Sequence, residues 1–186
     1  WLVDSAGARI HSDSGLGSKD LSLFADTGYL FREEVTMSGV IPLVAAMVGP
    51  GAAGTAYIPG LADFVPMVKG NSSMAIGGPY LVKGVVGEDI SEEDLGGADI
   101  HCKISGCADL SVSNDEECIT AIRKYLSYFP SHCTDKPERL SSKPTLSQYS
   151  EKILDIIPEN PRQAYDVKKV LRAITDDSDF FEIKPD

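Results

Sequence analysis

The sequence lacks the motifs of several common enzyme classes. It contains no G-x-S-x-G nucleophile elbow, no H-E-x-x-H metal motif and no G-x-x-x-x-G-K-[ST] phosphate loop, and it has only 3 histidines. These absences argue against an α/β-hydrolase, a zincin metalloprotease and a P-loop NTPase. The acidic run Glu92–Asp94 fits a helix start better than a paired-carboxylate site, and His101 is interpreted as a structural histidine.

Positive charge and paired cysteines are also scarce. Lysine and arginine total 17 against 28 aspartates and glutamates, which gives a net charge of −11 and argues against nucleic acid or an anionic membrane as a partner. No apolar run is long enough to span a bilayer, and no secretory h-region is visible. The 4 cysteines include no C-x-x-C, so we expect no metal site and reduced thiols, in the cytoplasm or the mitochondrial matrix.

Alternating strand and helix patterns predict an α/β fold. Strands are expected at Trp1–Val3, Val40–Val48, Phe64–Val68, Ser73–Ile76 and Phe180–Lys184. Helices are expected at Lys19–Ser38 (loosened at Gly28), from Tyr57 to about Asp63, from Pro79 to a stop at Gly87, and over Val167–Ile174.

Two capping boxes, Ser91-x-x-Asp94 and Ser113-x-x-Glu116, mark further helix starts. The second precedes a stripe that we expect to be buried, formed by Ile119, Ile122, Leu126 and Phe129. Pro130–Ser150 is polar and proline-containing, which predicts a linker.

Two turns of small residues each follow an apolar strand. The first is SAGAR, and the second lies in VGPGAAGTAYIPGLADF, Val48–Phe64. A run without side chains is typical of a segment that a ligand approaches closely, and backbone N–H groups at such turns stabilise a developing oxyanion. The alternative is that both turns are small only for packing.

Taken in order, the motifs resemble a known family. D-S-A-G-A-R-I, S-G-V-I-P, V-G-P-G-A-A-G-T-A-Y and S-S-M-A-I-G-G-P-Y resemble the carboxyltransferase (beta) subunit of biotin-dependent acyl-CoA carboxylases, of the propionyl-CoA or acetyl-CoA carboxylase type. The likeness covers the chain except for a linker from about Ser131 to Glu151. It implies part of a crotonase-like ββα spiral: residues 1–130 from the first domain, 131–160 as linker and 161–186 opening a second domain. Since both ends fall inside apparent strands, we expect a piece of a longer polypeptide that is inactive alone.

The resemblance also implies the site. Ala6 and Gly7 would form a backbone oxyanion hole, and a second set would bind acyl-CoA: Ala8, Arg9, Gly49, Gly51, Ala52, Ala53, Gly54, Thr55, Tyr57, Gly77 and Gly78. The coenzyme A thioester is the implied substrate, and biotin, carboxylated on a partner carrier, is the implied cofactor. The family commonly has glycine at the position of Ala6, and it differs at Gly51, Ala53, Thr55 and Ile58, so the acyl pocket is expected to differ.

The implied activity is transfer of CO2 from carboxybiotin to the α-carbon of an acyl-CoA through a thioester enolate. Implied partners are a biotin carboxylase, a biotin carboxyl carrier subunit and further copies of the chain. Alternatives are an acyl-CoA decarboxylase subunit coupled to a sodium pump, a crotonase-fold hydratase or isomerase, and a non-catalytic fragment. A hydratase needs a carboxylate base, and the sequence indicates none beside either turn.

Overall fold

The computed structural model describes residues 1–7, 28–138, 153–175 and 178–185. The chain divides into two compact units, Trp1–Lys136 with Ile183–Asp186 as unit 1, and Pro137–Glu182 as unit 2. Expectations for Ala8, Arg9, the helix before Gly28 and most of the proline-containing linker fall outside the described residues. None of the described helices combines the length and apolar character that a bilayer-crossing segment needs.

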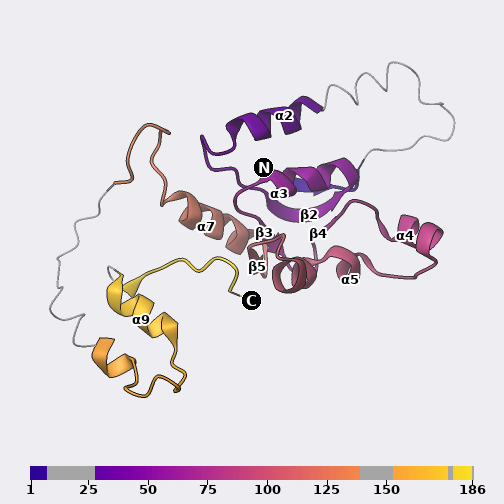
Figure 1. The fold of residues 1–186 in the computed structure, drawn as a ribbon. Coiled ribbons are helices and arrows are strands. Elements are labelled where there is room, and N and C mark those ends of the chain that lie inside the picture. The colour runs from indigo at the N-terminus through magenta and orange to yellow at the C-terminus, as the bar shows by residue number, and fades with distance from the viewer. Residues whose placement is uncertain (8–27, 139–152, 176–177, 186) are drawn as a thin grey trace. The chain divides into compact units, whose positions relative to one another are not determined.

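Unit 1 is built on a five-stranded parallel sheet (Figure 1). The strand order is β1-β2-β3-β5, and β4 pairs with the carboxyl half of β2. The strands are β1 Leu2–Ser5, β2 Ala46–Ala52, β3 Pro66–Val68, β4 Ser73–Ala75 and β5 Leu110–Val112. A parallel sheet with intervening helices confirms the predicted α/β class.

The centre of the sheet is buried on both faces because alternate side chains of β2 enter different clusters. Met47 packs with Val3 and Met67 on one face, and Ala46 packs with Val68 on the other. The helical segments are α2 Gly28–Met37, η1 Ala53–Ala56, α3 Tyr57–Leu61, α4 Pro79–Val86, α5 Glu92–Gly96, α6 Ala98–Ile100, η2 His101–Ser105, α7 Asp115–Leu126 and α9 Val167–Ile174.

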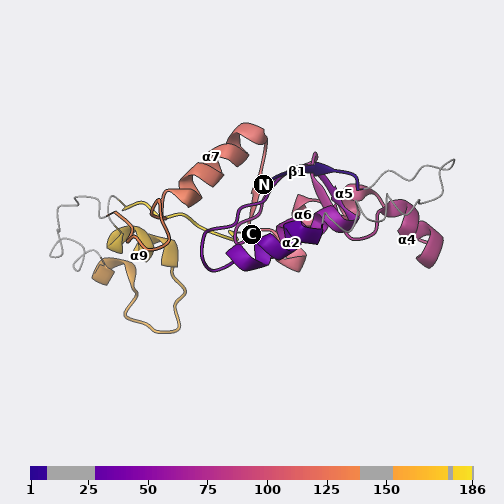
Figure 2. The ribbon, with the colours of Figure 1, turned by 90° about the horizontal axis from the view of Figure 1, so that it is seen from above.

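Two helix boundaries follow the predicted capping. Gly87 ends α4 in the left-handed conformation, with φ +79, and the Ser91 hydroxyl accepts the Asp94 N–H at 3.0 Å at the start of α5. Helix α4 contains no buried residue and lies at the margin of unit 1 (Figure 2).

The strand expected at Val40–Val48 begins later in the chain. Val40 and Ile41 are exposed in a turn, and β2 starts at Ala46. It runs on through Gly49–Ala52, which the sequence assigned to a turn, because β1 and β4 pair with this half of the strand. Strand pairing thus overrides the low strand propensity of Gly and Pro.

The helix after this strand is shorter than expected. It ends at Leu61 rather than near Asp63. The Asp63 carboxylate instead accepts the Leu43 N–H at 2.8 Å, so it ties the chain before β2 to the chain before β3.

The start of α7 lies one residue later than the predicted capping box. Asn114 accepts the Glu117 N–H at 2.9 Å, and the Glu117 carboxylate accepts the Ser113 N–H at 2.9 Å. The Glu117 carboxylate thus reaches one residue beyond the N-cap Asn114, so the arrangement is a variant of the capping box with Asn at the N-cap.

The predicted buried stripe of α7 is only partly correct. Ile122 packs against the core, but Ile119, Leu126 and Phe129 are 36–41% exposed. The buried residues are Cys118, Ala121 and Tyr125. The two small residues let the helix approach the sheet, and Tyr125 stacks on Phe64 with ring centroids 4.4 Å apart.

The strand expected at Phe180–Lys184 does not form; the structure assigns these described residues to irregular backbone. Inside unit 2, Arg172 of α9 lies over the Phe180 ring at 5.5 Å, and Lys168 pairs with Glu182 at 2.8 Å.

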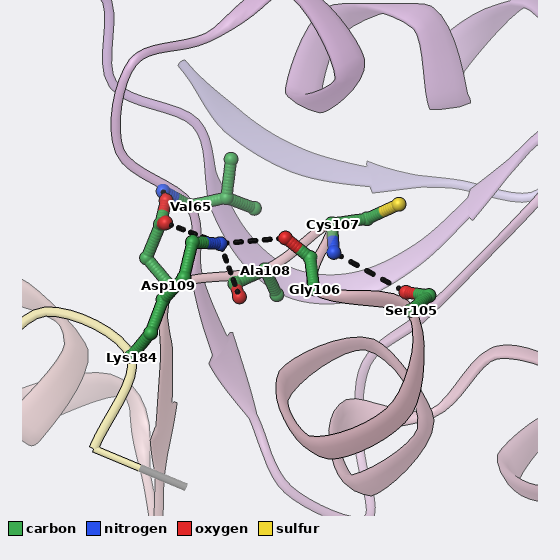
Figure 3. Close-up of polar contacts among 7 residues, drawn as sticks. All are labelled: Val65, Ser105, Gly106, Cys107, Ala108, Asp109 and Lys184. Atoms are coloured by element: carbon green, nitrogen blue, oxygen red, sulfur yellow. Dashed lines mark hydrogen bonds and ion pairs between the residues drawn. The ribbon is translucent and has the colours of Figure 1, made fainter.

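Within unit 1, Lys184 connects the segment near the end of the chain to the chain around Asp109 (Figure 3). Its ammonium pairs with the Asp109 carboxylate at 2.8 Å and donates to the carbonyls of Gly106 and Ala108 at 2.5 and 3.2 Å. The other Asp109 oxygen accepts the Val65 N–H at 2.8 Å. Asp109 therefore joins the terminal segment to the chain that enters β3.

Candidate functional site

The carboxyl ends of β1 and β2 bring the two small-residue turns together. Parallel strands end at the same edge of a sheet, and Ser5 at the end of β1 pairs with Gly51 of β2. The Thr55 hydroxyl lies 3.2 Å from the Ser5 carbonyl and 2.6 Å from the Ala52 carbonyl. The turn after Ser5 therefore lies against the turn after Ala52.

Gly7 occupies a conformation that favours glycine, with φ +91. A Cβ there would lie 3.5 Å from the Ala52 carbonyl oxygen. The Gly7 N–H donates to the Ser5 hydroxyl at 3.3 Å, beyond the usual range for such a bond. A negatively charged oxygen is a stronger acceptor and would compete well for this donor.

Ala53 turns the chain out of β2 with φ +54, one of the few non-glycine residues of the described chain with a positive value. Such strain persists only where surrounding contacts fix it, and it is frequent at ligand sites. The chain then continues through η1 into α3, whose Tyr57 packs edge-on against Phe31 of α2 at 5.4 Å. The turn thus has a strained residue, Ala53, and the helix that follows it is fixed by the contact of Tyr57 with Phe31.

The glycines between Gly49 and Gly54 lack a side chain for different reasons. A Cβ at Gly49 would collide with the Asp4 carboxylate, and a Cβ at Gly51 would lie 2.7 Å from the Met47 methyl. A Cβ at Gly54 would meet no atom within 4 Å. Internal packing therefore explains Gly49 and Gly51, whereas only Gly54 is left bare for no internal reason. A role in acyl-CoA binding stays a prediction for all three.

A pocket of about 400 Å³ opens at this edge of the sheet. Six of the predicted site residues line it: Ala6, Gly51, Ala52, Ala53, Gly77 and Gly78. Gly7, Gly49, Gly54, Thr55 and Tyr57 lie in or beside the two turns without lining the pocket. Ala8 and Arg9 lie outside the described residues.

The pocket also contains residues that the sequence did not indicate. They are Pro50, Ser73, Ala75, Ile76, Pro79, Tyr80, Leu81, Glu92 and Leu95. The sequence could have indicated Ser73–Ile76, because a strand is predicted there and parallel strands end at the same edge of the sheet. The prediction that no carboxylate lies beside either turn is wrong, because Glu92, the first residue of α5, lines the same pocket as Ala6.

His101 is fully hydrogen-bonded, as expected for a structural histidine. Its Nε2 lies 2.7 Å from the Met74 carbonyl oxygen and its Nδ1 lies 2.8 Å from the Ser105 hydroxyl. It opens η2, a π-helical turn that ends at Gly106 with φ +69.

Within the described ranges, no group of three or more His, Cys, Asp or Glu residues is arranged to hold a metal ion. None of the 4 cysteines, all of which are described, forms a disulfide. Near the end of β3, hydrogen bonds from Lys69 and Lys103 hold the pKa of the Asp99 carboxyl below its usual value. These ammonium charges are therefore balanced locally.

Comparison with known proteins identifies the same family over the whole chain. The carboxyl transferase domain matches residues 1–186. The propionyl-CoA carboxylase beta chain of Cereibacter sphaeroides is 38% identical over 186 residues, which cover 100% of this chain and 35% of that protein. The methylmalonyl-CoA decarboxylase subunit alpha of Veillonella parvula is 36% identical over 184 residues, 99% of this chain and 35% of that protein.

The fold matches as well. The transcarboxylase 12S structure, solved as a hexamer with hydrolysed methylmalonyl-CoA bound, superposes with a TM-score of 0.84 at 34% identity, over 98% of this chain and 34% of that one. The predicted crotonase-like fold is thereby confirmed. The chain spans about a third of the length of these relatives.

Proposed function

Because this chain belongs to the carboxyl transferase domain family, we propose that it forms the acyl-CoA side of a biotin-dependent carboxyltransferase site. The observation that carries the proposal is the meeting of two backbone turns, after Ser5 and after Ala52, at one pocket. Backbone donors beside a pocket lined by small residues suit a thioester that reacts through an enolate.

In this proposal the acyl-CoA lies along Ala52–Gly54, with Gly77 and Gly78 on the opposite wall. Small side chains on both walls leave the backbone exposed to an extended pantetheine arm. Ala8 and Arg9 remain predicted contacts of the same ligand. The apolar side chains of Ile76 and Leu81, which line the pocket, are the contacts that we assign to the acyl chain.

The chemistry assigned to the chain is stabilisation of charge on the thioester oxygen. The Ala6 and Gly7 N–H groups would donate to this oxygen as the α-carbon loses its proton. One donor of this kind typically contributes about 10²–10³ in rate, or roughly 3–4 kcal/mol. Carboxybiotin, bound outside the described residues, would release the CO2, and the biotin ureido nitrogen freed in this way would accept the α-proton. The residues of this chain then have to bind, orient and shield the thioester, and no side chain has to act as base.

The proposed partners are a biotin carboxylase, a biotin carboxyl carrier subunit and further copies of the protein. Four cysteines without a disulfide support a reducing compartment, the cytoplasm or the mitochondrial matrix. The related transcarboxylase assembles as a hexamer, which supports an oligomer here.

The test uses the protein with its native flanking sequence. Calorimetric titration with propionyl-CoA should show saturable binding, and addition of a carboxylated biotin carrier should place labelled CO2 on the α-carbon. Free CoA should bind more weakly, because it lacks the thioester oxygen. Absence of any binding of propionyl-CoA would overturn the proposal.

Decarboxylation is the second candidate, because the Veillonella relative named for that activity is nearly as similar as the carboxylase. Both reactions use the same oxyanion, so this chain's geometry serves either direction. The two are separated by supplying methylmalonyl-CoA and an uncarboxylated biotin carrier, without ATP. Fast CO2 release that is coupled to a membrane partner would favour the decarboxylase.

A further inference from the structure

The His101 side chain contacts the backbone of β4, the strand that forms one wall of the pocket. The Met74 carbonyl oxygen lies 2.7 Å from Nε2, and Met74 is the central residue of β4. Its neighbours Ser73 and Ala75 both line the pocket. We propose that His101 is a positioning residue for acyl-CoA binding, which acts by fixing β4. The inference rests on the proposed function, but its structural part is measured without a ligand.

The hydrogen bonds fix which ring nitrogen carries the proton. A carbonyl oxygen only accepts, so Nε2 must donate to Met74. In the neutral ring Nδ1 then accepts from the Ser105 hydroxyl at 2.8 Å, and the Ser105 oxygen accepts the Cys107 N–H at 3.2 Å. Both ring nitrogens are therefore hydrogen-bonded, and Ser105 of η2 sets the orientation of the ring.

Strand β4 needs this support because it is short. Among the described residues it pairs along its length with β2 alone, and its other edge carries a single bridge, from Ser73 to Gly97. It has 3 residues, and its pairing with β2 places Met74 opposite Gly51. A backbone carbonyl that points away from the partner strand needs a hydrogen-bond donor from elsewhere. His101 supplies the donor at this position.

The surrounding backbone is shaped around the contact. At Gly96, the last residue of α5, a Cβ would collide with the Met74 carbonyl oxygen and would lie 3.1 Å from His101 Nε2. Gly96 is therefore without a side chain where histidine and carbonyl meet. The geometry couples α5, η2 and β4 at one point, on the side of β4 away from β2.

Loss of the donor should leave the Met74 carbonyl without its partner and let Ser73–Ile76 shift. Misplacement of a bound substrate by about 1 Å costs on the order of 10²-fold in rate. We therefore expect His101→Phe, which keeps an aromatic ring, to lower kcat/KM for propionyl-CoA by about 10²-fold, through a lower kcat and a higher KM. His101→Gln retains an N–H donor and should recover most of this loss.

The matched control is His132→Phe, because His132 is exposed and bonds to Thr134 at 2.9 Å within its own turn. It should leave KM unchanged. A second variant, Ser105→Ala, removes the hydroxyl that orients the ring. Ser105 is exposed, so this variant should fold, and we expect it to raise KM in the same direction but less.

Amide hydrogen exchange and ring ¹⁵N shifts test the structure without ligand. Exchange at Ala75 and Ile76 should accelerate in His101→Phe and return toward the parent rate in His101→Gln, and His101 should show the Nε2-protonated tautomer. Unchanged exchange in a folded His101→Phe protein, or equal KM values for the Phe and Gln variants, would overturn the inference. If the parent protein fails to bind propionyl-CoA, the proposed function fails, and the exchange result still decides the role of His101.

Discussion

Replacing Gly54 with valine tests where the acyl-CoA lies without disturbing the fold. A Cβ at this position would meet no atom within 4 Å, and Gly54 lies in η1 with an ordinary φ. Substitutions at open positions usually change the free energy of unfolding by no more than about 0.5 kcal/mol. We expect the melting temperature of Gly54→Val to stay close to that of the parent.

Binding should respond very differently from stability. The isopropyl group would project from the turn that follows Ala53, over which we place the thioester. A misfit of about one methylene in a ligand pocket costs roughly 1–3 kcal/mol, or 10–200-fold. The Kd for propionyl-CoA, measured by calorimetry on the protein with its native flanking sequence, should rise by about this factor.

Two other glycines provide matched comparisons. Gly60 of α3 is also open, with no atom within 4 Å of a Cβ, and Gly60→Val should leave both Kd and stability near the parent values. Gly51→Val should instead lower the melting temperature, since its Cβ would lie 2.7 Å from the methyl of the buried Met47, which would have to move. A folded Gly54→Val protein whose Kd stays within about threefold of the parent, below the range for a pocket misfit, would refute the placement of the ligand.

Three further predictions follow from the site and the core. A backbone ester at position 7, which deletes the Gly7 N–H, should lower kcat by about 10²–10³ with a modest change in KM; a fall within about threefold, far less than an oxyanion donor supplies, would show that this turn serves packing alone. Glu92→Gln should reduce carboxylation by less than tenfold, whereas loss of about 10²–10⁴ would identify Glu92 as a general base and favour a hydratase or isomerase. Burial raises the pKa of the Cys118 thiol to about 11, so it stays protonated and should be unreactive toward a disulfide reagent at pH 8, while exposed Cys107 reacts; rapid modification of Cys118 in the folded protein would contradict its burial.

Much of the α/β architecture was predictable because it depends on local signals. Pro79 and Gly87 bound α4 as their backbone preferences require, and the Ser91 cap lies where its spacing indicates. The errors arise where distant contacts decide. Gly49–Ala52 is extended only because β1 and β4 pair beside it, and this pairing is not encoded in the segment itself.

The site was partly predictable for the same reason. The two turns were identified from their missing side chains, and the sheet brings them together through Thr55. Glu92 was missed because its sequence context is that of a helix start, and only the packing of α5 beside β4 brings it to the pocket. The contact of His101 with Met74 joins residues far apart in the chain, and no local pattern indicates such a pair.

The attachment of Lys184 to Asp109 has a consequence for the entropy of the chain. Because the polypeptide leaves unit 1 after Lys136 and rejoins it at Ile183, Pro137–Glu182 forms a closed loop rather than a tail. For an unfolded chain of this length, closure costs about 3 kcal/mol from the (3/2)RT ln n dependence. The ion pair, whose Lys184 side chain is 46% exposed, and the hydrogen bonds around it act against that cost. The Asp109 carboxylate therefore shares this closure with the backbone carbonyls of Gly106, Ala108 and Asp109, which also accept hydrogen bonds from Lys184.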